Sequence, residues 1–275
     1  MNTKKIITKV IANLLAWIIS IISLVPLLLV IFNSLKDSVH ASDMNLKLPV
    51  FPFMWANFSN VVSKGKLAQS FFNSALYSVA SVALCCILAA TCAYVFSRNQ
   101  SKINKAFYMY IVLGIAMPIN YVALMKVMAF FHLINNRFGL ILLYTAMQLP
   151  FAIFLLHGFI AKVPVDLDEA AMLDGCSPLR LFSSIIFPLL KPALATVIVL
   201  TFLNTWNEFV SPLYFLSSSS KWPMTLSVYN FFGMYHTDWN LICADIILTS
   251  LPVIIVYLLG QKHIVSGMTS GAVKG

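Results

Sequence analysis

The chain has 275 residues, of which 60% are hydrophobic and only 10% are charged. Soluble domains carry about a quarter charged residues, so this composition, with a mean hydropathy of +0.88, excludes an ordinary soluble globule. The formal net charge is +9, from 18 Lys and Arg against 9 Asp and Glu. Because these basic residues are scattered rather than grouped in one stripe, we expect contact with membrane lipid and no nucleic-acid partner.

Apolar stretches of about 20 residues recur along the chain, and each can cross the hydrocarbon core of a bilayer as a helix. Lipid offers the backbone no hydrogen-bond partners, so the spans must satisfy their own polar groups. We therefore predict an all-α membrane protein with a single transmembrane domain over residues 1–275. The six expected spans are residues 11–34, 71–96, 106–128, 139–161, 188–212 and 241–260.

The first span is expected to be an uncleaved anchor, because its apolar core from Val10 to Phe32 is longer than the roughly 7–15 residues of a cleaved signal peptide. The longest connector, residues 35–70, contains prolines and aromatic residues. We predict a folded interfacial segment there.

Loop charges predict the orientation, because cytoplasmic segments carry an excess of Lys and Arg. With both termini inside, eleven basic residues fall in the inner segments and six in the outer ones. Lys126 lies near the outer end of the third span and can reach the interface. We therefore expect a multi-pass membrane protein with both termini in the cytoplasm.

Catalysis and metal binding are not expected of this chain. Its five cysteines and five histidines are dispersed without the spacing of a metal site, and the sequence has no phosphate-binding loop or nucleophile motif. We predict a protein that is not an enzyme, with no catalytic residues, no metal site and no cofactor of its own.

One acidic segment, residues 162–188, interrupts the apolar pattern between the fourth and fifth spans. It holds four of the nine carboxylates: Asp166, Asp168, Glu169 and Asp174. Pro164 suits the first turn of a helix, and the carboxylates that follow it lie near the positive end of the helix dipole. A metal-binding or catalytic carboxylate cluster is an alternative, but Asp166, Asp168 and Asp174 do not share one narrow helix face.

The same segment has residues typical of the ends of helices, and they predict a helix, a sharp turn and a second helix. Gly175 suits the left-handed residue that ends the first helix. Ser177 can cap the second, with Pro178 at its first position, and Pro188 is expected to end it. We predict a helix pair on the cytoplasmic membrane surface; the plainer alternative is a connector whose acids are solvated.

This segment resembles the cytoplasmic EAA signature of permease subunits of binding-protein-dependent ATP-binding cassette (ABC) importers. The signature is E-A-A, three residues, G, nine residues, I, one residue, L-P. The chain matches it at Glu169, Ala170, Ala171, Gly175, Ile185 and Pro188, with Phe187 in place of Leu. The surrounding residues look like the carbohydrate branch. Trp206–Phe209 resembles that branch's WN-E/D-F motif, and the end from Gln261 resembles the tail of the MalG-like subunits of maltose-type importers.

The resemblance implies a type I ABC importer (MetI-like) permease fold whose cytoplasmic coupling helix sits in a cleft of an ATPase subunit. Glu169 would pair with a basic residue there, Ala170 and Ala171 would allow close approach, and Gly175 would form the turn. The implied coupling set is Glu169, Ala170, Ala171, Asp174, Gly175, Ile185 and Pro188. Residues 261–275 would reach into the ATPase dimer; the alternative is a frayed basic terminus.

The implied function is that of a transmembrane permease subunit, forming half of the pathway of an ATP-driven oligosaccharide importer in a bacterial inner membrane. Its partners would be a second homologous permease, two ABC ATPase subunits and an extracytoplasmic sugar-binding protein. ATP and Mg would be used by the partner ATPase and not by this chain.

Polar and aromatic residues within the later spans are candidates for the substrate path or for contact with the binding protein. Polar groups are costly in lipid, so these side chains are expected to face the bundle interior or a wet cavity. Interhelical hydrogen bonding is the equal alternative. The candidates are Asn120, Gln148, Asn204, Trp206, Asn207 and Glu208.

Two other functions remain open from the sequence. An ion-coupled secondary transporter needs ionisable residues near the membrane midplane, and only Glu208 and Asp245 are candidates, both near the outer surface. An ABC permease for glycerol phosphate or polyols is the other alternative. A phosphate cargo calls for Arg or Lys in the cavity, where the spans offer only Lys126.

Overall fold

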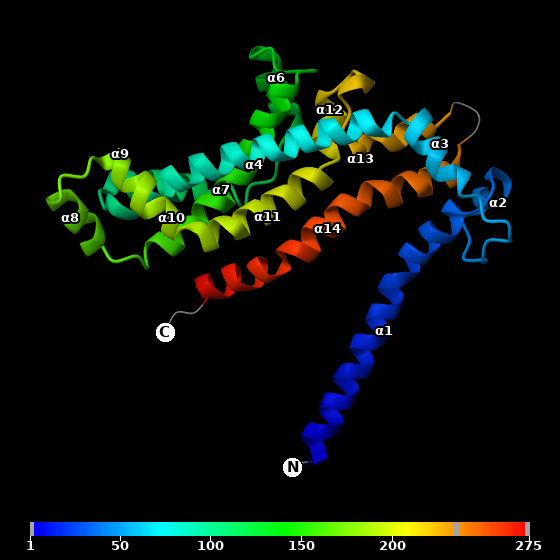
Figure 1. Ribbon diagram of the computed structural model, residues 1–275, viewed down its shortest axis with the longest axis horizontal. Helices are drawn as coiled ribbons and strands as arrows, with labels where there is room; N and C mark the ends of the chain where they lie inside the picture. The colour runs from blue at the N-terminus through cyan, green and yellow to red at the C-terminus, as the bar shows by residue number, and fades with distance from the viewer. Residues whose placement is uncertain (1–2, 234–236, 273–275) are drawn as a thin grey trace. The chain divides into compact units, whose positions relative to one another are not determined.

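The computed structural model describes residues 3–233 and 237–272, with side chains described for residues 8–233 and 237–264. Within these ranges the regular structure is helical apart from an isolated bridge between Phe232 and Thr237 (Figure 1). Four of the described helices are long and apolar enough to cross a bilayer. They are α1 (Thr3–Ser34), α4 (Leu67–Arg98), α7 (Arg137–Ile160) and α14 (Trp239–Ala272).

A fifth candidate span is a bent pair. The helical run Pro178–Leu189 meets α11 (Lys191–Asn207) at 75°. The predicted fifth span, residues 188–212, therefore differs from the structure at both ends. Its predicted start lies before the bend, and at the other end α11 stops at Asn207 and a separate helix, α12 (Val210–Phe215), follows. The predicted sixth span also continues further, since α14 remains helical through the expected tail as far as Ala272, and residues 273–275 lie outside the described part.

The third predicted span, residues 106–128, is not one continuous helix. It is divided between α5 (Lys102–Leu113) and α6 (Tyr121–Phe130). Gly114 is the C-cap of α5, and Pro118 in the break has no N–H for a helical bond. The Asn120 side chain then starts α6 by accepting hydrogen bonds from the N–H groups of Val122 and Ala123, both at 3.1 Å.

Shorter helices fill the connectors. The segment between the first two spans is folded, as predicted, around two of them. These short elements are α2 (Ser38–Ser42), α3 (Ala56–Lys64), α8 (Asp166–Leu173), α9 (Pro178–Leu181), η1 (Phe182–Ile186), α10 (Phe187–Leu189), η2 (Ser219–Lys221), α13 (Met224–Ser227) and η3 (Val228–Phe231).

The chain forms two compact units. The first unit comprises Met1–Ala68 with Ser227–Leu251, and the second comprises Gln69–Leu226 with Pro252–Gly275. Each is described by itself below.

The first unit is organised around the buried amide of Asn57 on α3. Its Nδ2 donates to the carbonyl oxygens of Ser34 (2.7 Å) and Lys36 (2.8 Å), at the end of α1. Its Oδ1 accepts a hydrogen bond of 2.9 Å from Asn240 on α14. One side chain thus satisfies the last carbonyl of α1 and a carbonyl just after the helix, and it joins three segments that are distant in sequence.

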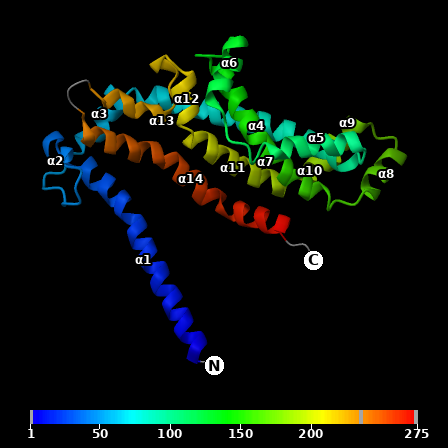
Figure 2. The same cartoon turned by 180° about the vertical axis from the view of Figure 1, so that it is seen from behind.

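The core of the second unit is formed by small residues of α4 packed against α7, α8, α9 and α11. In both views, α8 and α9 lie beside the C-terminal end of α4 (Figures 1 and 2). Gly260 of α14 lies against α11 so closely that an added Cβ would come within 2.6 Å of Val199. Close packing of small residues is typical of helix contacts within membranes.

We expect Asn57→Leu to destabilise the protein by about 2–4 kcal/mol, because it leaves buried carbonyl and amide groups without partners. Asn60→Leu, a matched substitution on the same helix at a residue with no side-chain hydrogen bond in the described structure, should change stability little. Thermal unfolding of both purified variants in detergent compares them. Equal unfolding temperatures would contradict the role assigned to Asn57.

Candidate functional site

The acidic segment forms the predicted helix, turn and helix. Helix α8 begins at Asp166, two residues after Pro164, so the proline precedes the first turn and does not lie within it. The first turn carries Asp166, Asp168 and Glu169, and no side chain caps its N–H groups. Three carboxylates therefore lie where the helix dipole is positive, as the sequence predicts.

The turn is closed by Gly175, which has a φ of +77°. The N–H groups of Gly175 and Cys176 donate to the carbonyls of Met172 and Ala171, each at 3.0 Å, which satisfies the last carbonyls of α8. Ser177 then caps α9 by accepting from the N–H of Arg180, and Pro178 occupies the first turn. The turn predictions for Gly175, Ser177 and Pro178 are confirmed.

The prediction that Pro188 ends the second helix is wrong. The helical path continues through the π-helical turn η1 and through α10, in whose first turn Pro188 lies. The N–H of Phe187 donates to the carbonyl of Phe182, five residues earlier, and a proline in the first turn needs no such donor. The path bends only at Leu190, before α11.

A buried ion pair fixes α8 to α4, and sequence reasoning missed it. Asp168, only 3% exposed, accepts from Nε of Arg98 at 2.8 Å and from its Nη2 at 3.3 Å. Tyr94 Oη donates to the same carboxylate at 3.1 Å, and Arg98 Nη1 donates to the carbonyl of Val163 at 3.1 Å. Arg98 and Asp168 are 70 positions apart, so no local spacing connects them; the three neighbouring carboxylates are exposed.

The outer surface of the helix pair is unusually apolar for a segment between spans. Leu173 is 89% exposed and Leu179 is 78% exposed, and Glu169 and Ala170 of α8 are exposed as well. Ala171, by contrast, is buried in the core of the second unit. A cavity of about 340 Å³ between the two helices brings together four predicted residues: Ala171, Asp174, Gly175 and Ile185. An exposed surface that combines apolar side chains with carboxylates is suited to a protein partner.

Among the predicted pathway residues, the structure brings Gln148 and Asn204 together. Asn204 Nδ2 of α11 donates to Gln148 Oε1 of α7 at 3.0 Å, and both residues line a cavity of about 510 Å³. The break between α5 and α6 supplies another wall of this cavity through Gly114, Met117 and Ile119.

The other four pathway candidates lie elsewhere. Asn120 caps α6, as described above. Trp206 is buried, with its ring 5.3 Å from that of Phe202 and 5.8 Å from that of Phe71. Glu208 Oε1 accepts from the N–H of Ser211 at 2.8 Å, which caps α12, while Asn207 is exposed at the end of α11.

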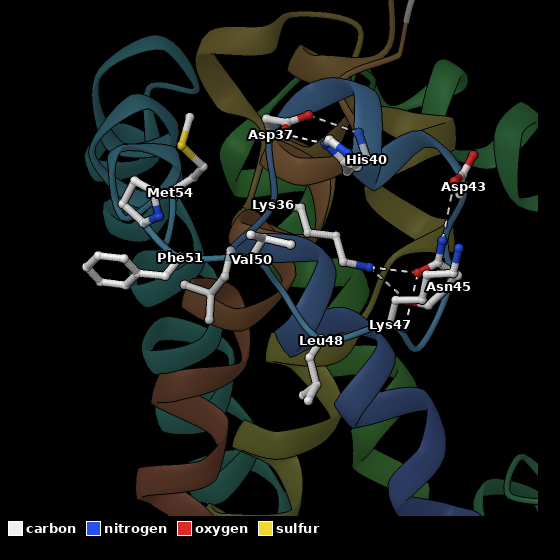
Figure 3. A pocket seen from close by; sticks show the side chains of 12 residues that line it. Lys36, Asp37, His40, Asp43, Asn45, Lys47, Leu48, Val50, Phe51 and Met54 are labelled. Atoms are coloured by element: carbon white, nitrogen blue, oxygen red, sulfur yellow. Dashed lines mark hydrogen bonds and ion pairs between the residues drawn. The ribbon is translucent and has the colours of Figure 1, made fainter.

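A further cavity, of about 450 Å³, lies within the first unit (Figure 3). Lys36 Nζ donates to Asn33 Oδ1 (2.9 Å) and to the carbonyl and side-chain oxygens of Asn45 (3.0 and 2.9 Å). All three ammonium donors thus have neutral acceptors, and burial lowers the pKa of Lys36. Hydrogen bonds from the backbone and ring of His40 lower the pKa of Asp37. These contacts indicate a structural role for the polar wall.

The described residues hold no group of three or more His, Cys, Asp or Glu side chains that could bind a metal ion.

Residues 85–270 match the family described as the binding-protein-dependent transport system inner membrane component. The chain is 36% identical to the multiple sugar-binding transport system permease protein MsmG of Streptococcus mutans, over 92% of this chain and 93% of that protein. It is 31% identical to the melibiose/raffinose/stachyose import permease protein MelC of Bacillus subtilis, over 96% of each.

Among solved structures, a bacterial ABC transporter involved in the import of the acidic polysaccharide alginate contains a similar chain. The TM-score is 0.82 at 22% identity, covering 95% of this chain and 98% of that one. This likeness establishes the fold.

We expect Asp168→Ala to destabilise the protein by about 3–5 kcal/mol, because it leaves the partly buried Arg98 guanidinium unpaired. Asp166→Ala, at an exposed carboxylate in the same turn, removes only a dipole interaction of about 0.3–1 kcal/mol. Hydrogen exchange of α8, measured with thermal unfolding, reports both effects. Similar exchange in the two variants would contradict the anchoring role of Asp168.

Proposed function

The chain belongs to the binding-protein-dependent transport system inner membrane component family, and from this we propose that it forms half of the transmembrane pathway of an ATP-driven oligosaccharide importer. The observation that carries the proposal is the anchored helix pair of residues 166–181. It is fixed to α4 by Asp168 and presents Glu169 with exposed apolar side chains. That arrangement is suited to a surface that another protein binds.

We assign this surface to coupling with the ATPase subunits. Glu169 is free to pair with a basic residue of the ATPase, and Ala170 is small enough for close approach. Leu173 and Leu179 provide the apolar contact area. Gly175 sets the angle between the two helices. Ala171 acts differently from its implied role, since it packs inward and holds α8 on the core of its own unit.

Movement of the helix pair reaches the spans by two routes. The Arg98–Asp168 ion pair joins α8 to the end of α4, so a movement of α8 would be transmitted to that end. The helical run through η1 and α10 would transmit the movement to α11 across the 75° bend at Leu190. Closure of the ATPase dimer would therefore move α4 and α11 together and change which side of the membrane the pathway faces.

The membrane arrangement that fits this function has six spans. Four are the long helices, the bent pair that ends in α11 is the fifth, and α5 with α6 together supply the third in chain order. Both termini lie in the cytoplasm of a bacterial cell, which places the helix pair on the side of the ATPase.

The complex requires a second permease, two ATPase subunits and an extracytoplasmic sugar-binding protein. ATP and Mg are bound by the ATPase subunits, and this chain serves as a non-catalytic component without a cofactor. The tail from Gln261 onward, helical as far as Ala272, is assigned to contact with the ATPase dimer. The relatives MsmG and MelC are named as permeases for sugar transport, which supports an oligosaccharide cargo.

We expect Glu169→Lys to lower sugar uptake by more than about 10-fold, because it sets like charges against each other at the ATPase contact. Uptake by cells expressing the complete transporter measures the effect, and co-purification of the ATPase with the tagged chain measures assembly. Glu169→Gln, which removes the charge without reversing it, should lie between wild type and Glu169→Lys.

The matched control is Asp43→Lys, the same charge reversal at an exposed carboxylate of the connector between the first two spans. It should leave ATPase recovery unchanged. Normal uptake by Glu169→Lys, with the chain inserted at normal levels, would refute the coupling role.

We expect Gly175→Val to weaken ATPase recruitment and to destabilise the turn by about 1–2 kcal/mol, because an L side chain is strained at positive φ. An added Cβ would meet no atom within 4 Å, so the backbone alone causes the effect. Gly175→Asn, which tolerates this conformation better, should retain more ATPase. Equal recovery from Val and Asn variants would count against the turn assignment.

A further inference from the structure

The cavity of about 510 Å³ beside Gln148 and Asn204 combines polar and apolar walls. It is an open cavity bordered by α7, the break between α5 and α6, the start of α6 and the side chain of Asn204 from α11. None of the residues that line it is charged. The cavity therefore presents only uncharged groups to a ligand.

The amide pair at this cavity is only partly satisfied. The bond from Asn204 Nδ2 to Gln148 Oε1 uses one donor and one acceptor. Gln148 Nε2 and Asn204 Oδ1 make no hydrogen bond with the described residues, and Asn204 is exposed. Two amides in an apolar span carry a cost unless water or a ligand pairs with them. The unpaired donor, Gln148 Nε2, and the unpaired acceptor, Asn204 Oδ1, thus belong to the two amides that this hydrogen bond joins.

Pro150 adds a third polar group. It lies inside α7 and has no N–H to donate to the carbonyl of Ala146, four residues earlier. Ala146 is exposed and lines the cavity, and its carbonyl lacks the helical donor that another residue at position 150 would supply. A backbone acceptor thus stands about half a turn before Gln148 on the same helix.

The remaining wall is formed by Met147, Phe151 and Ile119. Pyranose rings present apolar C–H faces together with hydroxyl groups that both donate and accept. A cavity with an amide donor, two acceptors and an apolar wall matches that surface. An anionic cargo would instead need Arg or Lys to pair with its carboxylate or phosphate.

We infer that this chain itself contacts the transported sugar, through Gln148, Asn204 and the carbonyl of Ala146, and that this subsite accepts uncharged oligosaccharides. The inference rests on the proposed importer function and deepens it. It assigns to this subunit a direct part in recognising the cargo during passage, in addition to the selection made by the binding protein.

The test uses the complete transporter, with its binding protein, in proteoliposomes and radiolabelled raffinose, or diacetylchitobiose if raffinose is not imported. Gln148→Leu and Asn204→Leu should each lower uptake at saturating binding protein by about 3- to 10-fold, the factor for loss of about one hydrogen bond. Gln100→Leu, the same substitution at an exposed residue outside the cavity, should leave uptake unchanged. Recovery of the ATPase with each variant reports assembly.

A second measurement does not depend on transport. Ala146→Cys places a thiol at the cavity wall, and the labelling of this thiol by a maleimide is followed in the solubilised complex. Labelling in the wild-type background corrects for native cysteines. Raffinose at millimolar concentration should slow the labelling at least about 3-fold, whereas trigalacturonate, an acidic trisaccharide, should not.

The outcomes separate the two proposals. Absence of ATP-dependent import of either neutral sugar by the wild-type complex would refute the oligosaccharide importer function itself. Import by wild type, with both Leu variants behaving like Gln100→Leu, would overturn the assigned hydrogen bonds. Unchanged labelling with raffinose would overturn the contact, and equal protection by trigalacturonate would overturn the preference for uncharged sugars.

Discussion

The buried ion pair between Arg98 and Asp168 is the contact on which the rest of the proposed mechanism depends. It is bidentate, is joined by Tyr94, and lies where α8 meets the end of α4. Loss of one partner from such a pair is costly, because the other charge stays desolvated. The pair therefore holds α8 in one orientation, in which Asp168 faces inward and Glu169, the next residue, faces outward.

The connection from α8 to the membrane core is continuous as well as anchored. Ala171 of α8 and Leu181 of α9 are buried in the same cluster as Ala89 of α4 and Leu194 of α11. The π-helical turn η1 carries the chain past Pro188 without a break, and the sharp bend comes only at Leu190. The helix pair therefore packs in one core with two spans, α4 and α11.

Proline and glycine create the cavity between α7 and the broken third span. Gly114 ends α5 so close to Pro150 that a Cβ there would lie 3.1 Å from the proline ring. Pro150 in turn leaves the Ala146 carbonyl without its helical donor. Pro150 thus leaves one carbonyl without its helical partner beside the cavity, and such backbone is tolerated in a membrane protein where it is buried in protein or lines a water-filled cavity.

The sequence by itself determined the features that local chemistry controls. Long apolar runs specify α1, α4, α7 and α14, because hydrophobicity over about 20 residues needs no tertiary information. Gly175, Ser177 and Pro178 specify the turn of the helix pair, because capping and positive φ are set by neighbouring residues. Only the tertiary structure decided what depends on partners distant in sequence. It chose Asp168 from four similar carboxylates to meet Arg98, placed Gln148 against Asn204 and buried Trp206. Hydropathy could not foresee these outcomes, because each depends on which side chains α4, α7 and α11 bring within hydrogen-bonding or packing distance.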